Sequence, residues 1–377
     1  MVESNAFDVD VIIVGAGPAG LGCAALLRQM QLPRERLLVL DAGQVGASFH
    51  RWPREMRLIT PSFPANGFHQ TDLNAITPDT SPAFSLRREH PTGVEYADYL
   101  GKVVDHYDIP VATQEAVTEV YPLKEGFELY TARPRRLRCR FVIWAGGEYG
   151  AALIPTIEGA EWARHNSELG SYAEQTGDHQ IIIGGYESGI DAAWHWVGAG
   201  KSVTMLERRN EWEHTYDPSR VLSPISQERF EQLRDNPRFE LASGREVTRI
   251  ERQASGYRVF CQTGEQWSAI DAPTLCTGFN ANLGPVESLF LYDDEGVPFT
   301  NSFDESTLVP GLFLTGSRLA YGDILLCFIY KFRGRFPVVC GTIGAELELD
   351  VEVMRHYQQA GMLLDDLSCC EDQQCFC

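Results

Sequence analysis

The fold of this chain is decided by the stretch Val11-Ile-Ile-Val-Gly15-Ala-Gly17-Pro-Ala-Gly20. Its first four residues are apolar, and they run into glycines with the spacing G-x-G-x-x-G. An apolar helical pattern follows over residues 21–30, and a second apolar run, 37–40, ends in Asp41. This order predicts a strand, a glycine turn, a helix and a second strand, which together form a unit that binds a dinucleotide.

Each glycine of this first motif has an expected task. Gly15 permits the tight turn, Gly17 lets the backbone approach a pyrophosphate, and Gly20 lets helix and strand pack closely. The helix N-terminus attracts the phosphates, and Asp41, at the expected offset of about 20 residues, suits the ribose hydroxyls. The alternative, a glycine turn without a ligand, is less favoured because this acid is present. The candidate residues of the motif are Gly15, Gly17, Pro18, Ala19, Gly20, Asp41 and Ala42.

A second glycine motif lies near the middle of the chain, at Ile181-Ile-Ile-Gly184-Gly185-Tyr186-Glu-Ser188-Gly189. If Gly184 and Gly189 take the outer roles, Tyr186 occupies the middle place, where a side chain intrudes on a pyrophosphate. A helical pattern at 188–197 and a strand at 202–206 complete the unit. The candidate residues are Gly184, Gly185, Tyr186, Glu187, Ser188 and Gly189.

The strand after this second motif ends in Glu207-Arg208-Arg209. Glu207 suits a ribose diol, whereas Arg208 and Arg209 suit a 2′-phosphate through charge-assisted bonds. NADPH is therefore favoured slightly over NADH. The alternative is a repeat that has lost its nucleotide or holds a different one.

Two further apolar runs also end in glycine turns, at Ala145-Gly146 and at Thr-Gly316-Ser317. The order of motifs predicts an α/β chain with two Rossmann-like, three-layer nucleotide-binding domains, the second inserted into the first. The expected boundaries are 1–155 and 284–350 for the two parts of the first domain, 156–283 for the inserted domain, and 351–377 for an acidic, cysteine-rich tail.

Composition narrows the function classes. The formal net charge of −20 disfavours nucleic acid and anionic membrane surfaces, because both reward clustered Lys and Arg. No apolar run is long enough to span a membrane, although 44% of the residues are hydrophobic. The acidic N-terminus has neither the basic nor the apolar region of a secretory signal, so we expect a cytoplasmic protein.

The ten cysteines fall into two groups. Six lie singly in apolar contexts, where a cytosolic cysteine behaves as a small buried hydrophobe: Cys23, Cys139, Cys261, Cys276, Cys327 and Cys340. Four lie in the last nine residues: Cys369, Cys370, Cys375 and Cys377. The tail is open to three interpretations: a redox relay, a soft-metal site, and an incidental or regulatory end. Its carboxylates raise thiol pKa values, which counts against a fast nucleophile.

The order of glycine motifs over roughly residues 8–345 resembles the FAD-dependent pyridine-nucleotide oxidoreductases built like low-molecular-weight thioredoxin reductase. Within that superfamily, Trp144-Ala-Gly-Gly-Glu-Tyr149-Gly150 and Phe328-Ile-Tyr-Lys331-Phe-Arg-Gly334 look like the bacilliredoxin reductase branch. In contrast, Gly46-Ala-Ser-Phe-His50-Arg51-Trp52 and the stretch 159–167 look like flavin-containing monooxygenases.

The resemblance implies FAD at the first motif, NADPH or NADH at the second, and a homodimer. It adds candidate FAD contacts at Ser48, Phe49, Trp52, Ala145, Gly146, Gly316, Ser317 and Asp323. The chain departs from the family pattern in three ways. Residues 180–283 contain no Cys-x-x-Cys, Ala19 stands where the bacilliredoxin reductase branch has cysteine, and Ser317 stands where many relatives have the Asp that bonds the flavin ribitol.

We therefore expect an enzyme that moves electrons between NAD(P)H and a thiol or disulfide acceptor through FAD. The acceptor is a small molecule or a protein, and Cys369, Cys370, Cys375 and Cys377 are the candidate redox residues. No resident metal is assigned. The alternatives are a flavin-dependent monooxygenase, and a flavin-bound redox or soft-metal sensor without NAD(P)H turnover.

Overall fold

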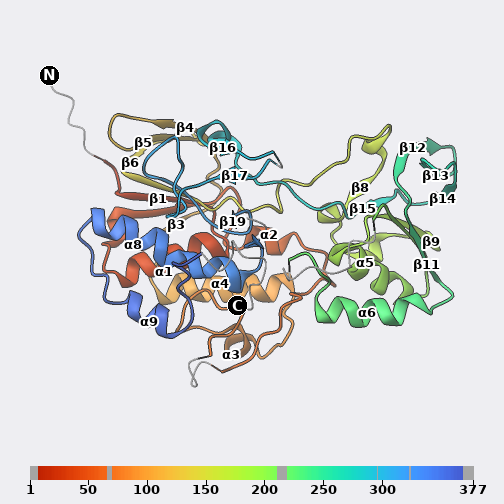
Figure 1. Ribbon diagram of the computed structural model, residues 1–377, viewed down its shortest axis with the longest axis horizontal. Coiled ribbons are helices and arrows are strands. Elements are labelled where there is room, and N and C mark those ends of the chain that lie inside the picture. The colour runs from red at the N-terminus through yellow and green to blue at the C-terminus, as the bar shows by residue number, and fades with distance from the viewer. Residues whose placement is uncertain (1–6, 66–69, 210–218, 295, 322–323, 368–377) are drawn as a thin grey trace. The chain divides into compact units, whose positions relative to one another are not determined.

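The computed structural model describes residues 7–65, 70–209, 219–294, 296–321 and 324–367 (Figure 1). The chain divides into two compact units. The first consists of Met1–His50, Thr60–Gly150 and Ala281–Cys377, and the second consists of Arg51–Ile59 and Ala151–Asn280.

The first unit is built on a parallel sheet of five strands in the order β18-β7-β1-β2-β3. The strands are β1 (Val11–Val14), β2 (Leu37–Leu40), β3 (Val111–Ala112), β7 (Phe141–Trp144) and β18 (Leu312–Leu314). The central strands are apolar throughout because both faces of a parallel sheet are covered. Strand β18 pairs with β7, and β7 pairs with β1. The segments that follow β7 and β18 are far apart in sequence, but they therefore lie on the same side of the glycine turn after β1.

Helices cover one face of this sheet, and a smaller antiparallel sheet lies on the other (Figure 1). Helix α1 packs against α8 so tightly that a Cβ at Gly22 would lie 2.0 Å from the Phe336 ring. The helices of the unit are α1 (Pro18–Gln29), α2 (Ala47–His50), α3 (Pro82–Leu86), α4 (Gly93–His106), α7 (Ile329–Phe332), α8 (Phe336–Glu346) and α9 (Met354–Gln359). The remaining strands are β4 (Val117–Pro122), β5 (Phe127–Thr131), β6 (Arg136–Cys139), β16 (Leu291–Tyr292), β17 (Pro298–Phe299), β19 (Ala320–Tyr321) and β20 (Ile324–Leu325).

The second unit has its own parallel sheet, in the order β11-β10-β9-β15-β8. Its strands are β8 (Arg164–His165), β9 (His179–Ile183), β10 (Ser202–Glu207), β11 (Phe239–Ser243) and β15 (Thr274–Leu275). An antiparallel sheet adds β12 (Val247–Gln253), β13 (Gly256–Cys261) and β14 (Gln266–Ala269), and the helices are α5 (Glu187–Gly198) and α6 (Pro224–Arg234).

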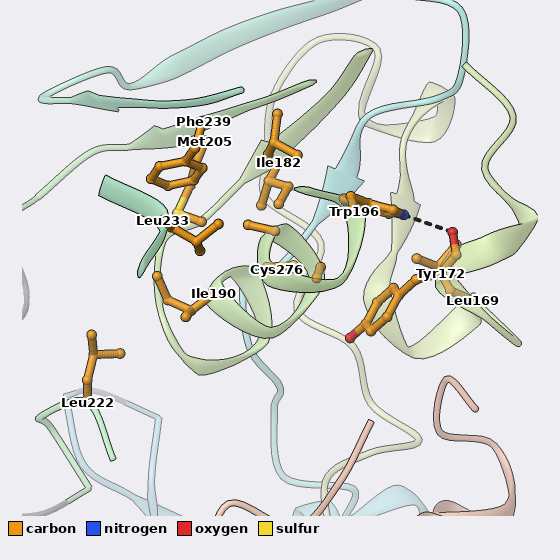
Figure 2. Close-up of a cluster of buried hydrophobic side chains, with 13 residues drawn as sticks. Leu169, Tyr172, Ile182, Ile190, Trp196, Met205, Leu222, Leu233, Phe239 and Cys276 are labelled. Carbon is orange, nitrogen blue, oxygen red and sulfur yellow. Dashed lines mark hydrogen bonds between the residues drawn. The ribbon is translucent and has the colours of Figure 1, made fainter. Parts of the chain in front are cut away.

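The core of the second unit forms around α5 (Figure 2). Trp196 is almost fully buried and donates a hydrogen bond from Nε1 to the Tyr172 carbonyl at 2.8 Å. Ile182 and Ile190, from β9 and α5, pack in the same cluster. This packing fixes α5 on the sheet and so fixes the glycine turn from which the helix starts.

An α/β fold with parallel sheets is confirmed, whereas the division into Rossmann-like domains at 155, 283 and 350 stays a prediction. The last part of the chain contains packed structure before the cysteines. Tyr357 of α9 is fully buried, and the Leu364 backbone N–H donates to the Gly334 carbonyl at 2.8 Å. The C-terminal segment is therefore held on the first unit up to Leu364.

Candidate functional site

The first glycine motif forms a loop that excludes side chains at two of its three glycines. Gly15 has a φ of +113°, and a Cβ there would lie 2.2 Å from the Ala145 carbonyl oxygen. A Cβ at Gly20 would lie 2.0 Å from the Gly15 carbonyl oxygen. At Gly17, by contrast, no atom lies within 4 Å of the Cβ position. The protein itself therefore leaves open the place where a pyrophosphate is expected.

The start of α1 and the end of β2 complete this first site. Gly17 is the N-cap of α1, makes no side-chain cap bond, and is followed by a first turn without acidic residues. An anion is favoured there because the first N–H groups of a helix lack internal partners. The Asp41 carboxylate accepts from the Ala16 backbone N–H at 2.8 Å and from the Gly43 N–H at 2.7 Å. These two bonds orient the carboxylate at the loop, where an acidic side chain suits a ribose hydroxyl.

The other predicted contacts of the first site lie around the same loop, with two exceptions. The Gly46 backbone N–H donates to the Ala16 carbonyl at 2.9 Å, which places α2, with Ser48 and the buried Phe49, beside the loop. Ala42 directly follows Asp41 and is exposed. Trp52 belongs to the second unit, and Asp323 lies outside the described residues.

Strands β7 and β18 define the far end of this site. Ala145 and Gly146 follow β7, while Gly316 and Ser317 follow β18. Since β2 lies on the other side of β1, a dinucleotide with its adenosine ribose at Asp41 would extend its second half past β7 and β18. The four residues thus border that second half.

Three residues near this end were not found from the sequence. The side-chain amide of Asn282 donates to the Gly146 carbonyl at 3.2 Å, and the Asn282 backbone N–H donates to the Gly147 carbonyl at 3.0 Å. Glu148 lies 3.7 Å from Arg318, and burial raises the pKa of the Glu148 carboxyl. Only Glu148 had a signal in the sequence, since it directly follows the Ala145 glycine turn.

The second glycine motif repeats the construction of the first. Gly184 has a φ of +107°, and its Cβ would lie 2.3 Å from the Cys276 carbonyl oxygen. A Cβ at Gly189 would lie 2.3 Å from the Gly184 carbonyl oxygen. The Gly185 N–H donates to Glu207 Oε2 at 2.6 Å, as the Ala16 N–H donates to Asp41 in the first motif. The two loops are thus equivalent residue by residue.

Tyr186 takes the place that Gly17 has in the first motif, as expected from the sequence. Its backbone is extended, with a φ of −102°, compared with −89° at Gly17. The ring packs against the hydrophobic cluster of Figure 2, and the hydroxyl donates to the carbonyls of Ser219 (3.0 Å) and Val221 (2.6 Å). The side chain is therefore directed at segment 219–221.

Around Tyr186, the second motif carries more charge than the first. Glu187, in the first turn of α5, accepts hydrogen bonds from Ser223 and Ser226, and burial raises its pKa. Ser188 is half-buried in the same turn, and Arg208 and Arg209 are exposed just beyond β10.

The predicted redox cysteines Cys369, Cys370, Cys375 and Cys377 lie outside the described residues. Five of the other six are buried, and Cys327 is half-buried. Burial raises the pKa of Cys261 to about 11 and that of Cys139 and Cys276 further still. A raised pKa suppresses the reactive thiolate, so these three thiols are poor nucleophiles.

The described part of the chain offers neither a clustered metal site nor a membrane-spanning helix. Among those residues, no group of three or more His, Cys, Asp or Glu side chains is arranged to hold a metal ion. No helix within the same residues has both the length and the apolar character needed to cross a membrane.

Known proteins resemble this chain over most of its length. A family model described as "Pyridine nucleotide-disulphide oxidoreductase" matches residues 12–316. The bacilliredoxin reductase Bdr of Bacillus subtilis is 25% identical, over 89% of this chain and 96% of the relative. A ferredoxin–NADP reductase of Nitrobacter hamburgensis is also 25% identical, over 88% of this chain and 89% of the relative.

A solved structure has the same fold. The bacillithiol disulfide reductase Bdr (YpdA) from Staphylococcus aureus superposes with a TM-score of 0.73, covering 90% of this chain and 98% of the other, at 22% sequence identity. At this identity the likeness concerns the fold alone.

Proposed function

Because the chain belongs to the pyridine nucleotide-disulphide oxidoreductase family, we propose that it transfers electrons from NADPH through FAD to a disulfide acceptor. Membership confirms the predicted superfamily, the prediction of an FAD-dependent oxidoreductase, and the cofactor pair FAD and NAD(P)H. The acceptor, the preference for NADPH and the residues at each site are our proposal.

The observation that carries this proposal is the pair of equivalent glycine loops, one in each unit. We assign FAD to the loop at Gly17, which is open, uncapped and free of acids in its first helical turn. Asp41 would hold the ribose, and Ala145, Gly146, Gly316 and Ser317 would border the flavin half. We assign the nicotinamide dinucleotide to the loop at Tyr186. FAD would supply the redox step, accepting a hydride and passing on two electrons.

A disulfide is the proposed acceptor, and one relative supports it by its name, bacilliredoxin reductase. Reduction of a disulfide consumes the two electrons and two protons and yields two thiols. The described chain provides no exposed cysteine pair for this step, because five of its six cysteines are buried. The tail cysteines Cys369 and Cys370 are therefore the proposed relay.

The position of the tail supports this role. Leu364 is bonded to Gly334 and to the Arg335 guanidinium, on the same unit as the FAD loop. Ten residues follow Leu367, and an extended chain of that length reaches at most about 35 Å. Cys369 and Cys370 follow this anchor by five and six residues in sequence, on the segment that leaves the unit to which we assign the flavin.

The test is NADPH-dependent reduction of a small disulfide by the purified holoenzyme under anaerobic conditions. We expect Cys369→Ser with Cys370→Ser to lower turnover at least tenfold while NADPH still reduces the flavin. Cys261→Ala, which removes a thiol of the second unit, is the control and should keep wild-type turnover. Unchanged turnover in the tail variant would remove the relay from the proposal.

Two other outcomes would replace the proposed reaction. NADPH oxidation that needs oxygen, without disulfide reduction, would identify a monooxygenase. Negligible NADPH oxidation, combined with tail-dependent binding of a soft metal, would identify a sensor. We also propose a homodimer, as the resemblance implies, and a mass measured in solution by light scattering would test it.

A further inference from the structure

The turn at residues 219–221 is fastened to the second glycine loop by one hydroxyl group. The Tyr186 hydroxyl lies 3.0 Å from the Ser219 carbonyl oxygen and 2.6 Å from that of Val221. A hydroxyl has a single proton, so the two carbonyls share it. Residues 219–221 lie between β10 and α6, and none of the three is buried. The turn can therefore move without unfolding a helix or a strand.

Directly after this turn the chain is fixed. Leu222 is 3% exposed and belongs to the core cluster around α5 (Figure 2). Ser223 is the N-cap of α6, and its backbone N–H and hydroxyl donate to the Glu187 carboxylate at 2.5 Å and 3.1 Å. The turn thus has a fixed end at residues 222–223 and a fastened end at Tyr186.

The fastened end lies where the first unit leaves its glycine loop open. Tyr186 is the N-cap of α5, as Gly17 is the N-cap of α1. No atom lies within 4 Å of a Cβ placed at Gly17, whereas the Tyr186 side chain brings residues 219–221 to the start of its helix. The start of a helix is also where the phosphates of a dinucleotide bind, because its first N–H groups lack internal partners. The turn is therefore held at the helix end that a dinucleotide needs.

We propose that residues 219–221 form a latch that closes the second glycine loop, and that a nicotinamide dinucleotide binds only after this latch has left Tyr186. The inference rests on the proposed function, since it needs a dinucleotide at this loop. The apparent affinity is then reduced by the fraction of molecules whose latch is open before the ligand arrives. The latch also gives a task to a tyrosine at a place where glycine is expected.

The test is calorimetric binding of NADP⁺ to the oxidised, FAD-loaded protein. Tyr186→Phe keeps the ring and removes the hydroxyl, so more molecules are open in advance. NADP⁺ should bind about threefold to tenfold more tightly, and the gain should lie in the association rate measured by stopped flow. A turn that lined the binding site would give the opposite sign, so equal or weaker binding by Tyr186→Phe would overturn the latch.

The matched control is Tyr257→Phe, which removes a tyrosine hydroxyl from β13 of the same unit and should change the affinity less than twofold. A thermal melt of each variant identifies any that fails to fold.

A second measurement needs no substitution. Hydrogen exchange of residues 219–223 in the wild type, followed by mass spectrometry, should become faster when NADP⁺ is added, because the ligand displaces the latch from Tyr186. Slower exchange on binding would show that the turn closes onto the ligand, and the latch would be refuted.

The outcomes separate the two proposals. If NADPH reduces the flavin of the wild type but Tyr186→Phe binds NADP⁺ no more tightly, the inference fails and the proposed function stands. If neither protein binds NADP⁺ and NADPH reduces the flavin of neither, the proposed function fails as well.

Discussion

Gly17 and Gly20 are three residues apart, but the structure predicts opposite consequences for the same change to alanine. A Cβ at Gly17 meets no atom within 4 Å, and the backbone there is extended, so Gly17→Ala fits the protein. We expect it to leave folding stability unchanged or raise it by about 0.4–1 kcal/mol, through the unfolded state. Its methyl group instead fills the space reserved for the pyrophosphate, so FAD affinity should fall about tenfold or more.

Gly20→Ala acts on the fold itself. Its Cβ would lie 2.0 Å from the Gly15 carbonyl oxygen and 3.1 Å from the Ile13 side chain. Overpacking of this kind costs about 1–3 kcal/mol, and so short a contact to backbone belongs at the upper end. With roughly 2–4 °C per kcal/mol for a domain of this size, the melting temperature should drop by about 6–12 °C.

The assay measures both quantities on the same preparations. Flavin-stripped protein is melted by circular dichroism, and FAD is titrated back by the quenching of its fluorescence. Gly17→Ala should melt at or slightly above the wild-type temperature and bind FAD weakly. Wild-type FAD affinity in Gly17→Ala would refute the assignment of the pyrophosphate to this loop.

Three further predictions concern stability. Asp304 and Arg335 form a fully buried ion pair in which burial raises the Asp304 pKa from its ordinary 3.8 to about 6, so the folded state binds the proton more tightly. The contribution of Asp304 to the free energy of unfolding is therefore present below pH 3.8 and is lost as the pH rises through about 6. Asp304→Asn should remove that part of the pH dependence of the unfolding free energy, as measured by urea titration. Trp196→Ala should cost about 3–5 kcal/mol by urea denaturation, because it empties a buried site in the α5 core and removes the bond to Tyr172. Thr92→Ala removes the capping box of α4 and should cost about 1 kcal/mol, whereas Thr92→Ser, which keeps the hydroxyl, should cost much less.

Local patterns were enough to predict the strand, glycine turn, helix and second strand at the start of the chain. The apolar run at β1, the glycine spacing and Asp41 at the end of β2 are close in sequence, and each has a physical task that few other residues perform. The same reasoning predicted that Tyr186 stands where a glycine is expected. The sequence also placed Ala145 and Gly316 at strand ends, and the structure brings both strands into one sheet with β1.

Contacts between distant segments were not predictable in this way. Residues 51–59 join the second unit because the Arg54 N–H donates to the Gly170 carbonyl and Glu55 accepts from Ser171 and from the Tyr172 N–H. No periodic pattern marks such pairings. The tie between Tyr186 and segment 219–221 is of the same kind, since a sequence shows that a side chain is present but not where its hydroxyl is bonded.

The central claim is that one chain holds two dinucleotides and passes electrons from one to the other. An anaerobic titration of the purified yellow protein with NADPH, followed by flavin absorbance, tests it most directly. The account predicts that one equivalent of NADPH fully reduces one equivalent of flavin, and that NADH does so only at higher concentration. A flavin that stays oxidised in excess NADPH but is bleached by dithiothreitol would contradict it, because electrons would then enter from thiols and not from the second glycine loop.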